Sequence, residues 1–423
     1  MSHLRLTEGG APVVMQLADE VGETLVRSQV AAAHRLGGGQ WEVAATSKVG
    51  VAAVAGVTIW IRPKVDIRRI LFLLGYAKNP GWRDDTVELA PVADLVPALA
   101  QAFVDQAERA IERGLLQGYV ETNDSLTVLR GRLREQDQLR QRFGIALPLL
   151  VRFDDHTVDI AENQLIRAAA ELLLRVPGVT ARTRGRLRGL RQVLADVTPH
   201  VRGTPLPRWS PTRLNGRYHV AIWLAELILH GNAVDHAPGD VRLGGFLVDM
   251  AKVYEDFLTA ALVEAFRSHG GRCRAQDRHH LDVNDRIAMK PDLVWYLDGR
   301  PAAVIDAKYK AEKPAGFPDA DLYQMLAYCT ALELPDGHLV YAKGNAAEVT
   351  HEVRHAGVTI HAHTVDLSRS PADLLGQVAD LAGRIGATTR SQGLVDSWFD
   401  PGKPSVALTP GPWRQARTRL ALL

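Results

Sequence analysis

One stretch of the sequence, residues 290–310, joins an expected hairpin to three charged side chains. Apolar runs at 293–297 and 302–305 flank Asp298-Gly299, a residue pair that favours tight hairpin turns. Both runs have the length and composition of strands, so the stretch predicts a β-hairpin. The side chains that could do chemistry stand at the open end of this hairpin.

The charged side chains are Asp292, Asp306 and Lys308. If residues 298–300 form the loop, Asp292 faces Asp306, and Lys308 shares a face with Asp306 because strand side chains alternate. A loop one residue longer or shorter would shift this register. Two carboxylates held close repel unless a cation lies between them, and Mg²⁺ prefers oxygen ligands. The spacing therefore predicts a Mg²⁺ site, in which Mn²⁺ could substitute, formed by both aspartates and the carbonyl oxygen of Ala307.

Pro291-Asp292 followed by Asp306-Ala307-Lys308 resembles the PD-(D/E)XK nuclease signature. Phosphodiester hydrolysis needs a positioned water, a cation that stabilises charge on the phosphoryl oxygens, and help for the leaving oxygen. Lys308 is expected to orient or deprotonate the attacking water and to stabilise the negative transition state. The alternative is a surface hairpin with ordinary acidic ends.

The flanking segments supply two further candidates. Residues 246–269 predict an amphipathic helix that carries Glu255, and residues 321–333 predict a helix that carries Gln324. Glu255 is expected to be a further metal ligand, although an exposed helix charge is the plain alternative. The predicted catalytic set is Asp292, Asp306, Lys308, Glu255 and Gln324.

Length and composition place the chain among globular proteins of several domains. It has 423 residues, of which 46% are hydrophobic and 23% are charged, so two to three domains are expected. The sequence has no run of 18 uncharged apolar residues, so no membrane span is expected, and the first residues lack the pattern of a signal peptide. Two cysteines are too few for a disulfide framework, which favours a cytoplasmic location.

The order of patterns predicts a mixed α/β (α+β) multidomain fold. Residues 1–85 are expected to form a β-rich, partner-docking domain, and residues 86–239 a helical, Arg-rich middle region. Residues 240–390 are expected to form the PD-(D/E)XK domain, with a central mixed sheet flanked by helices. Residues 391–423 form a tail to which no role is assigned.

The middle region concentrates positive charge. Between residues 128 and 217 there are 17 Arg, no Lys and 8 Asp plus Glu, and the densest part is 181–191. Such a stripe is the footprint expected for a phosphate backbone, whereas the alternative is a solvated helix face. The candidate nucleic-acid contacts are Arg182, Arg184, Arg186 and Arg188.

A second motif, His351 to His355, matches the zinc-protease pattern HExxH. That motif works on a helix, where its two histidines lie one turn apart on one face. The β-branched neighbours and Gly357 instead favour a strand that pairs with residues 358–365. A metal cluster with His361 and His363 is the alternative.

Several motifs together resemble the McrC family, the nuclease subunits of McrBC-type modification-dependent restriction systems. The N-terminal motifs are Val57 to Lys64 and the Leu-rich segment 71–76. The middle region contributes residues 114–119, 129–133 and 159–163. The last domain contributes Val253 to Glu255, Pro291-Asp292, Asp306 to Tyr309, and Tyr323-Gln324 with Tyr328. The resemblance implies a partner, a McrB-like hexameric AAA+ GTPase that reads modified double-stranded DNA and translocates. It further implies that the N-terminal part docks into that ring and stimulates it, while the nuclease domain cuts.

Two other functions fit the sequence. One is a non-enzymatic activator of an AAA+ ring that keeps a vestigial nuclease fold, and the other is a stand-alone nuclease. The chain has no GxxxxGK[ST] motif, so it is not expected to power translocation alone. GTP or ATP in that partner, and one metal ion or two in the site, stay open at this stage.

Overall fold

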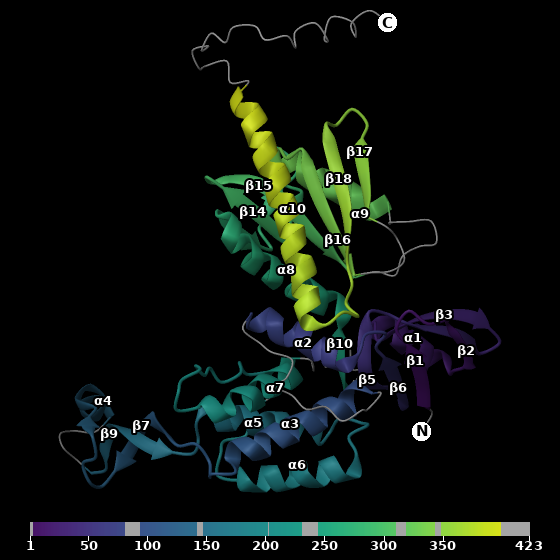
Figure 1. Cartoon of the computed structure of the whole chain (residues 1–423). Coiled ribbons are helices and arrows are strands. Elements are labelled where there is room, and N and C mark those ends of the chain that lie inside the picture. The colour runs from purple at the N-terminus through teal and green to yellow at the C-terminus, as the bar shows by residue number, and fades with distance from the viewer. Residues whose placement is uncertain are drawn as a thin grey trace, which may run out of the picture.

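The structure is a computed structural model that describes residues 3–80, 94–141, 147–201, 203–230, 244–309, 319–342 and 348–398. The predicted tail at 391–423 lies outside the described residues from residue 399 onward. Among the described residues, no helix is long and apolar enough to cross a membrane. Figure 1 shows a sheet-containing upper part, an N-terminal part below it at the right, and a layer of helices at the bottom.

The N-terminal elements are β1 (His3–Thr7), β2 (Val13–Gln16), α1 (Asp19–Ser28), β3 (Ala31–Gly37), β4 (Gln40–Ala45), β5 (Lys48–Val54), β6 (Val57–Arg62) and α2 (Ile67–Lys78). One small antiparallel sheet has the order β2-β4-β3. The other has the order β1-β6-β5-β10, where β10 (Gly244–Asp249) comes from much later in the chain. Strands thus dominate this range, while its predicted boundary and docking role stay predictions.

Strand β10 joins the N-terminal sheet to the rest of the chain. It runs antiparallel to β5, with Phe246 opposite Val51. It leads directly into α8 (Met250–Phe266), whose N-cap Asp249 accepts a hydrogen bond from the backbone N–H of Ala251 at 3.0 Å. The helix predicted over 246–269 therefore begins later than expected, because its first residues pair as a strand across the predicted boundary at residue 240.

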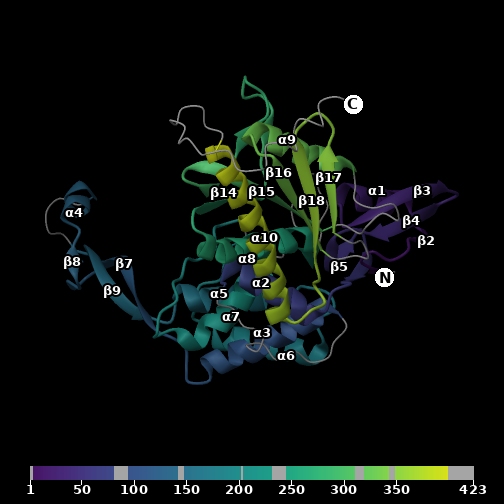
Figure 2. The same ribbon diagram turned by 45° about the horizontal axis from the view of Figure 1, so that its top comes forward.

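The middle region contains both a helical layer and a projecting arm. The helices are α3 (Leu95–Ile111), α5 (Ala161–Leu173), α6 (Ala181–Val193) and α7 (His219–His230). The arm consists of β7 (Gly118–Leu126), β8 (Arg132–Leu133), α4 (Glu135–Gln141) and β9 (Leu149–Thr157), with strand order β7-β9-β8. Figures 1 and 2 both show the arm extending away from the body. The prediction of a helical region is therefore wrong for the arm, whose strands were not predicted.

The largest sheet has six strands, and helices cover both of its faces. Its order is β11-β14-β15-β16-β18-β17, with parallel pairs β15-β16 and β16-β18 and antiparallel pairs elsewhere. The elements are β11 (Arg272–Ala275), β14 (Leu293–Leu297), β15 (Arg300–Lys308), α9 (Asp319–Leu332), β16 (Asp336–Ala342), β17 (Val349–Val353), β18 (Val358–Val365) and α10 (Pro371–Trp398). This matches the expected mixed sheet flanked by helices.

Alternation along the strands divides the core between the two faces. Ile305 and Val340 belong to the core that includes α8 and α10, whereas Val304 and Leu339 belong to the core that includes α9. Because Asp306 and Lys308 have the same parity as Val304, they lie on the α9 face. Figure 1 shows α10 crossing one face of the sheet.

The predicted hairpin is present, and its register at the open end is as predicted. Leu293 lies opposite Ile305, which places Asp292 level with Asp306. The turn itself differs, because Asp298 and Gly299 form a two-residue turn with φ of 50° and 81°, as in the tight hairpin turns that favour Asp-Gly. A β-bulge beside Trp295 then adds one residue on β15 and restores the predicted register.

The contact between β5 and β10 depends on glycine at position 50. A Cβ added to Gly50, whose φ is 129°, would lie 2.2 Å from the carbonyl oxygen of Phe246. Gly56 also has a positive φ, 82°, but its added Cβ would meet no atom within 4 Å. The two positions therefore separate backbone strain from steric overlap.

We expect Gly56→Ala to lower the free energy of unfolding by about 1–2 kcal/mol, the cost of a left-handed conformation. Gly50→Ala should cost about 1–3 kcal/mol more, the usual range for overpacking, because β10 must move away from β5. Chemical denaturation of both variants measures the difference. Equal losses of unfolding free energy in the two variants would contradict the close approach of the Phe246 carbonyl oxygen to position 50.

Candidate active site

Asp292 and Asp306 meet at the open end of the hairpin. Asp292 lies just before β14, and its Oδ2 accepts a hydrogen bond from the backbone N–H of Ala307 at 2.8 Å. Asp306 is on β15, is 3% exposed, and its Oδ2 forms an ion pair with Lys308. The two predicted carboxylates are therefore neighbours, as the register requires.

Lys308 connects the hairpin to helix α9. Its ammonium group forms an ion pair with Asp306 and donates a hydrogen bond to Gln324 Oε1 at 2.7 Å. Gln324 Nε2 in turn donates to the hydroxyl of Tyr328 at 2.9 Å, which places both helix residues on one face as their spacing predicts. The Lys308 side chain is 13% exposed, so its charge lies mostly out of water.

Glu255 reaches the same place from helix α8. Its Oε1 accepts hydrogen bonds from Lys252 Nζ at 2.8 Å and from Gln276 Nε2 at 2.6 Å. The same Gln276 nitrogen donates to Asp292 Oδ1 at 2.9 Å, so one amide links the helix carboxylate to the hairpin carboxylate. All five predicted catalytic residues therefore take part in one network of polar contacts.

Burial and the nearby charges raise the pKa values of the two aspartates in this network. Burial, followed by the charge of Asp306, raises the pKa of Asp292 to about 7 from its ordinary 3.8. Burial also raises the pKa of Asp306, although the ion pair with Lys308 opposes this shift. Loss of water disfavours the ionised form, and a second nearby carboxylate disfavours it further. The site is thus short of positive charge at neutral pH.

Sequence reasoning missed Gln276, Asp321 and Lys252. Strand β11 pairs with β14 and brings Gln276 opposite Asp292, and the Gln276 N–H donates to the Asp292 carbonyl oxygen at 3.0 Å. Asp321 on α9 is 3% exposed and lies 4.0 Å from Lys308 Nζ. The β11–β14 register was the signal that could have placed Gln276, whereas no pattern singles out Asp321.

The oxygen donors of the site suit a hard divalent cation such as Mg²⁺. Two observations agree with this donor chemistry, namely the raised pKa of Asp292 and the burial of the Asp306 carboxylate, which is 3% exposed. In the described part of the chain, however, no group of three or more His, Cys, Asp or Glu is arranged as a metal site. Lys308 forms an ion pair with Asp306, so cation binding by Asp306 would require this contact to rearrange.

The arginines predicted to contact nucleic acid lie on helix α6 and differ in their surroundings. Arg186 forms ion pairs with Asp105 and Glu108 of helix α3, the former at 2.7 Å. Arg182 and Arg188 are exposed, and Arg184 is half-buried. Arg186 therefore serves helix packing, and the other three stay candidates for contact with a phosphate backbone.

The HExxH segment forms a hairpin instead of a helix, as predicted. His351 lies on β17, which pairs with β18, and His355 has a φ of 61° in the turn between them. On the opposite face of the sheet from Asp306, His361 and His363 join His338 beside α10, around a cavity of about 370 Å³. His338 Nδ1 lies 3.2 Å from His363 Nε2, so these rings contact one another and the zinc-protease arrangement is absent.

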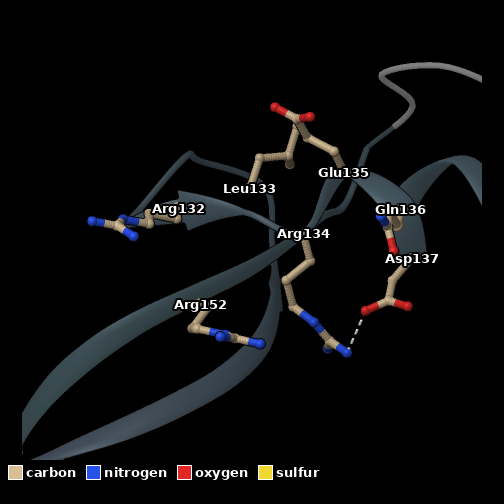
Figure 3. Close-up of a pocket in the computed structure, with 7 residues that line it drawn as sticks. All are labelled: Arg132, Leu133, Arg134, Glu135, Gln136, Asp137 and Arg152. Atoms are coloured by element: carbon tan, nitrogen blue, oxygen red, sulfur yellow. Dashed lines mark ion pairs between the residues drawn. The ribbon is translucent and has the colours of Figure 1, made fainter.

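A second cavity, of about 340 Å³, lies on the arm. Arg132 of β8 is directly opposite Arg152 of β9, and Arg134 follows β8. Arg134 pairs with Asp137 at 2.6 Å, whereas the Glu135 carboxylate points away from the three guanidinium groups (Figure 3). This cavity is distant from the carboxylate site, as the separation of arm and sheet in Figure 1 shows.

The pKa of Asp292 predicts how pH affects the cation-free protein. Because the folded pKa of about 7 exceeds the ordinary 3.8, this carboxyl contributes stability below about pH 4 that is lost as pH rises through 7. We expect Asp292→Asn to unfold at a higher temperature than wild type at pH 8 without divalent cations, and the two to converge near pH 4. The gain is at most about 4 kcal/mol, at about 1.4 kcal/mol per pKa unit. Calorimetry across this pH range checks the expectation, and parallel curves would contradict it.

Comparison with known proteins places the chain in a family. The family model for the McrBC 5-methylcytosine restriction system component matches residues 43–342. No curated protein matches the sequence.

Two solved structures resemble the chain. One is a refined half-complex from the tetradecameric assembly of Thermococcus gammatolerans McrB AAA+ hexamers with bound McrC, with a TM-score of 0.57, 18% identity, and coverage of 91% of this chain and 100% of that chain. The other is the cryo-EM structure of the Thermococcus gammatolerans McrBC complex, with a TM-score of 0.41, 21% identity, and coverage of 63% and 88%. At this identity the first likeness supports the fold alone. Because the family model spans more than half of the sequence, the chain belongs to the family of McrBC 5-methylcytosine restriction system components.

Proposed function

We propose that the chain is the McrC-type subunit of its restriction system, a Mg²⁺-dependent DNA endonuclease that works with an AAA+ NTPase. The observation that carries this proposal is the meeting of Asp292, Asp306 and Lys308 at one end of the six-stranded sheet. On this proposal, residues 240–390 form a PD-(D/E)XK nuclease domain. Metal-dependent phosphodiester hydrolysis needs charged side chains in fixed positions, and the mixed sheet holds these side chains at one end.

In the proposed reaction each side chain has a separate task. Asp292, Asp306, Glu255 and the carbonyl of Ala307 would hold the cation, which stabilises charge on the phosphoryl oxygens. Lys308 would orient the attacking water and neutralise negative charge as it develops, since its ammonium group stands beside Asp306 in a poorly hydrated position. Gln324 would fix Lys308 by the hydrogen bond that it accepts.

The proposed substrate is modified double-stranded DNA, in keeping with the family description of a 5-methylcytosine system. Anti-phage defence, a cytoplasmic location and a GTP-hydrolysing partner belong to the same proposal. Arg182, Arg184 and Arg188 on helix α6 are the proposed contacts with the phosphate backbone, because none of the salt bridges found among the described residues involves them. Arg186 is left out of this set because Asp105 and Glu108 hold it.

The proposed partner is a McrB-like AAA+ hexamer, of the kind present in the related Thermococcus gammatolerans assembly. The arm is the surface that we assign to this partner, in addition to the predicted docking of residues 1–85. It buries a small core of its own and leaves large apolar side chains in solvent, with Val128 73%, Leu129 58% and Leu139 67% exposed. Several such residues on one projecting element indicate an interaction surface.

Cleavage by the purified complex tests the nuclease proposal. Asp306→Ala removes a cation ligand and Lys308→Ala removes the water-orienting charge, so each should lower the cleavage rate by at least about a hundredfold. Glu264→Ala and Arg267→Ala serve as controls because these residues form an ion pair with each other at the C-terminal end of helix α8, away from Glu255. Partner binding and thermal unfolding should be nearly unchanged in the purified variants, and cleavage at the wild-type rate by either Ala variant would refute the roles assigned here.

Partner capture tests the assignment of the arm. Replacing Leu129 and Leu139 together with Asp should weaken binding to the AAA+ partner by at least about tenfold, since each 1.4 kcal/mol of lost contact energy is tenfold in affinity. Leu214→Asp is the matched control, because Leu214 is 87% exposed on another part of the chain. Undiminished capture by the double variant would remove the arm from the interface and favour docking by residues 1–85.

A second candidate is a non-enzymatic activator of the AAA+ ring. The observation that favours it is that the described acidic and histidine side chains are not gathered as a metal site. NTP hydrolysis by the partner separates the two functions. An activator stimulates hydrolysis without nicking DNA at any Mg²⁺ or Mn²⁺ concentration, whereas the proposed nuclease does both.

A further inference from the structure

Gln276 combines an unfavourable backbone conformation with contacts to two of the proposed cation ligands. Its φ is 52°, in the left-handed region that side chains rarely adopt. Its amide nitrogen donates to Glu255 Oε1 at 2.6 Å and to Asp292 Oδ1 at 2.9 Å. Strain of this kind persists where the surrounding contacts hold it, and it is often found at functional sites.

The place of Gln276 in the fold distinguishes it from other strained residues. Among the described residues, seven outside glycine have a positive φ, and several of these lie in hairpin turns or at helix ends, such as Asp298 and Gln29. Gln276 instead directly follows strand β11, where its N–H continues the ladder to the carbonyl oxygen of Asp292. Gln276 therefore lies in a turn at the end of a strand, beside the carboxylates, and not in a hairpin loop or at a helix end.

The neighbouring residue fastens this segment to the sheet. The hydroxyl of Tyr296 on β14 donates to Asp277 Oδ2 at 2.6 Å, and His279 Nε2 lies 3.3 Å from the same carboxylate oxygen. Backbone and side-chain contacts thus hold both sides of the Gln276 peptide against β14. The amide is presented from a fixed position instead of from a free loop.

Glu255 and Asp292 belong to elements that would otherwise position them independently. Glu255 lies on helix α8, which follows strand β10 of the N-terminal sheet, while Asp292 lies just before strand β14 of the hairpin. A donor between two carboxylates also offsets part of their repulsion without adding a net charge. Gln276 is a neutral side chain that contacts both of them.

We propose that Gln276 is a positioning residue of the cation site, whose amide brings the carboxylates of Glu255 and Asp292 to the spacing at which they bind one divalent cation together. This inference rests on the proposed function, because it takes these carboxylates as ligands. Residues that orient metal ligands without contacting the metal typically change metal affinity by 10–100-fold when removed. The backbone strain at Gln276 is the structural cost of holding the amide there.

Removing the side chain in two ways separates its role from the strain. Gln276→Gly and Gln276→Ala both delete the amide, but only glycine tolerates the positive φ without strain. We expect both variants of the full chain to bind Mn²⁺ about tenfold more weakly than wild type, as measured by electron paramagnetic resonance of free Mn²⁺. Gln276→Gly should nevertheless unfold at a higher temperature than Gln276→Ala. Binding that Asp306→Ala abolishes defines the site in each titration.

Gln29→Gly is the matched control. Gln29 has a φ of 53° at the end of helix α1, far from the carboxylates, so this change should leave Mn²⁺ affinity unchanged. With the AAA+ partner present, the Gln276 variants should need about tenfold more Mg²⁺ for half-maximal cleavage and should regain most of the wild-type rate at saturation.

The outcomes separate the inference from the proposed function. Wild-type affinity in Gln276→Gly, in a chain whose Asp306→Ala variant loses Mn²⁺, would overturn the positioning role and leave the nuclease intact. A wild-type chain without any Asp306-dependent Mn²⁺ binding would overturn both.

Discussion

Burial of carboxylates beside one another at the end of the six-stranded sheet is the constraint on which the site depends. Asp306 and Asp321 are each 3% exposed, and Asp292 has a pKa near 7 because of burial and of Asp306. An ionised carboxyl that loses water must gain donors or counter-charge. The protein supplies one ammonium group from Lys308, and the N–H groups of Ala307 and Gln276. These donors do not restore an ordinary acidity to Asp292, and a divalent cation would supply the remaining charge.

The same end of the sheet is attached directly to the N-terminal part. Strand β10 completes the N-terminal sheet and continues without a loop into helix α8, which carries Glu255. Tyr309, directly after Lys308, lies below Lys64 Nζ, which is 4.5 Å from the ring centroid. The N–H of Lys64 donates to the buried Glu8 carboxylate at 3.1 Å. Burial raises the pKa of Glu8, and this hydrogen bond opposes the shift. Two connections thus tie the β-rich part to residues adjacent to the site, and a change at one part has a packed route to the other.

Sequence alone predicted the centre of the site because alternation and strand pairing are local rules. The register of Asp292 against Asp306 came out as predicted, although the reasoning assumed a three-residue loop and the chain uses a two-residue turn with a compensating bulge. Gln276 depends on a second pairing, β11 with β14, that no turn signal specifies. Asp321 reaches the site because helix α9 packs on that face of the sheet, and such packing has no local signature. The arm was missed although Leu149, Val151 and Phe153 alternate along β9, because β7 has few apolar residues and the arm buries only a small core.

The arginines of the Arg-rich region differ in their surroundings, and these decide whether each one packs helices together or faces solvent. Arg167 donates to the carbonyl oxygens of Leu194 and Ala195 at 3.0 Å and so caps the chain after helix α6, while Arg186 ties that helix to α3. These guanidinium groups are used within the fold, since carbonyl and carboxylate acceptors occupy their donors. Arg182 and Arg188 project from the same helix into solvent. The stripe therefore contains two sets of arginines, one that holds helices together and one that is exposed to solvent, and charge density along the sequence does not distinguish them.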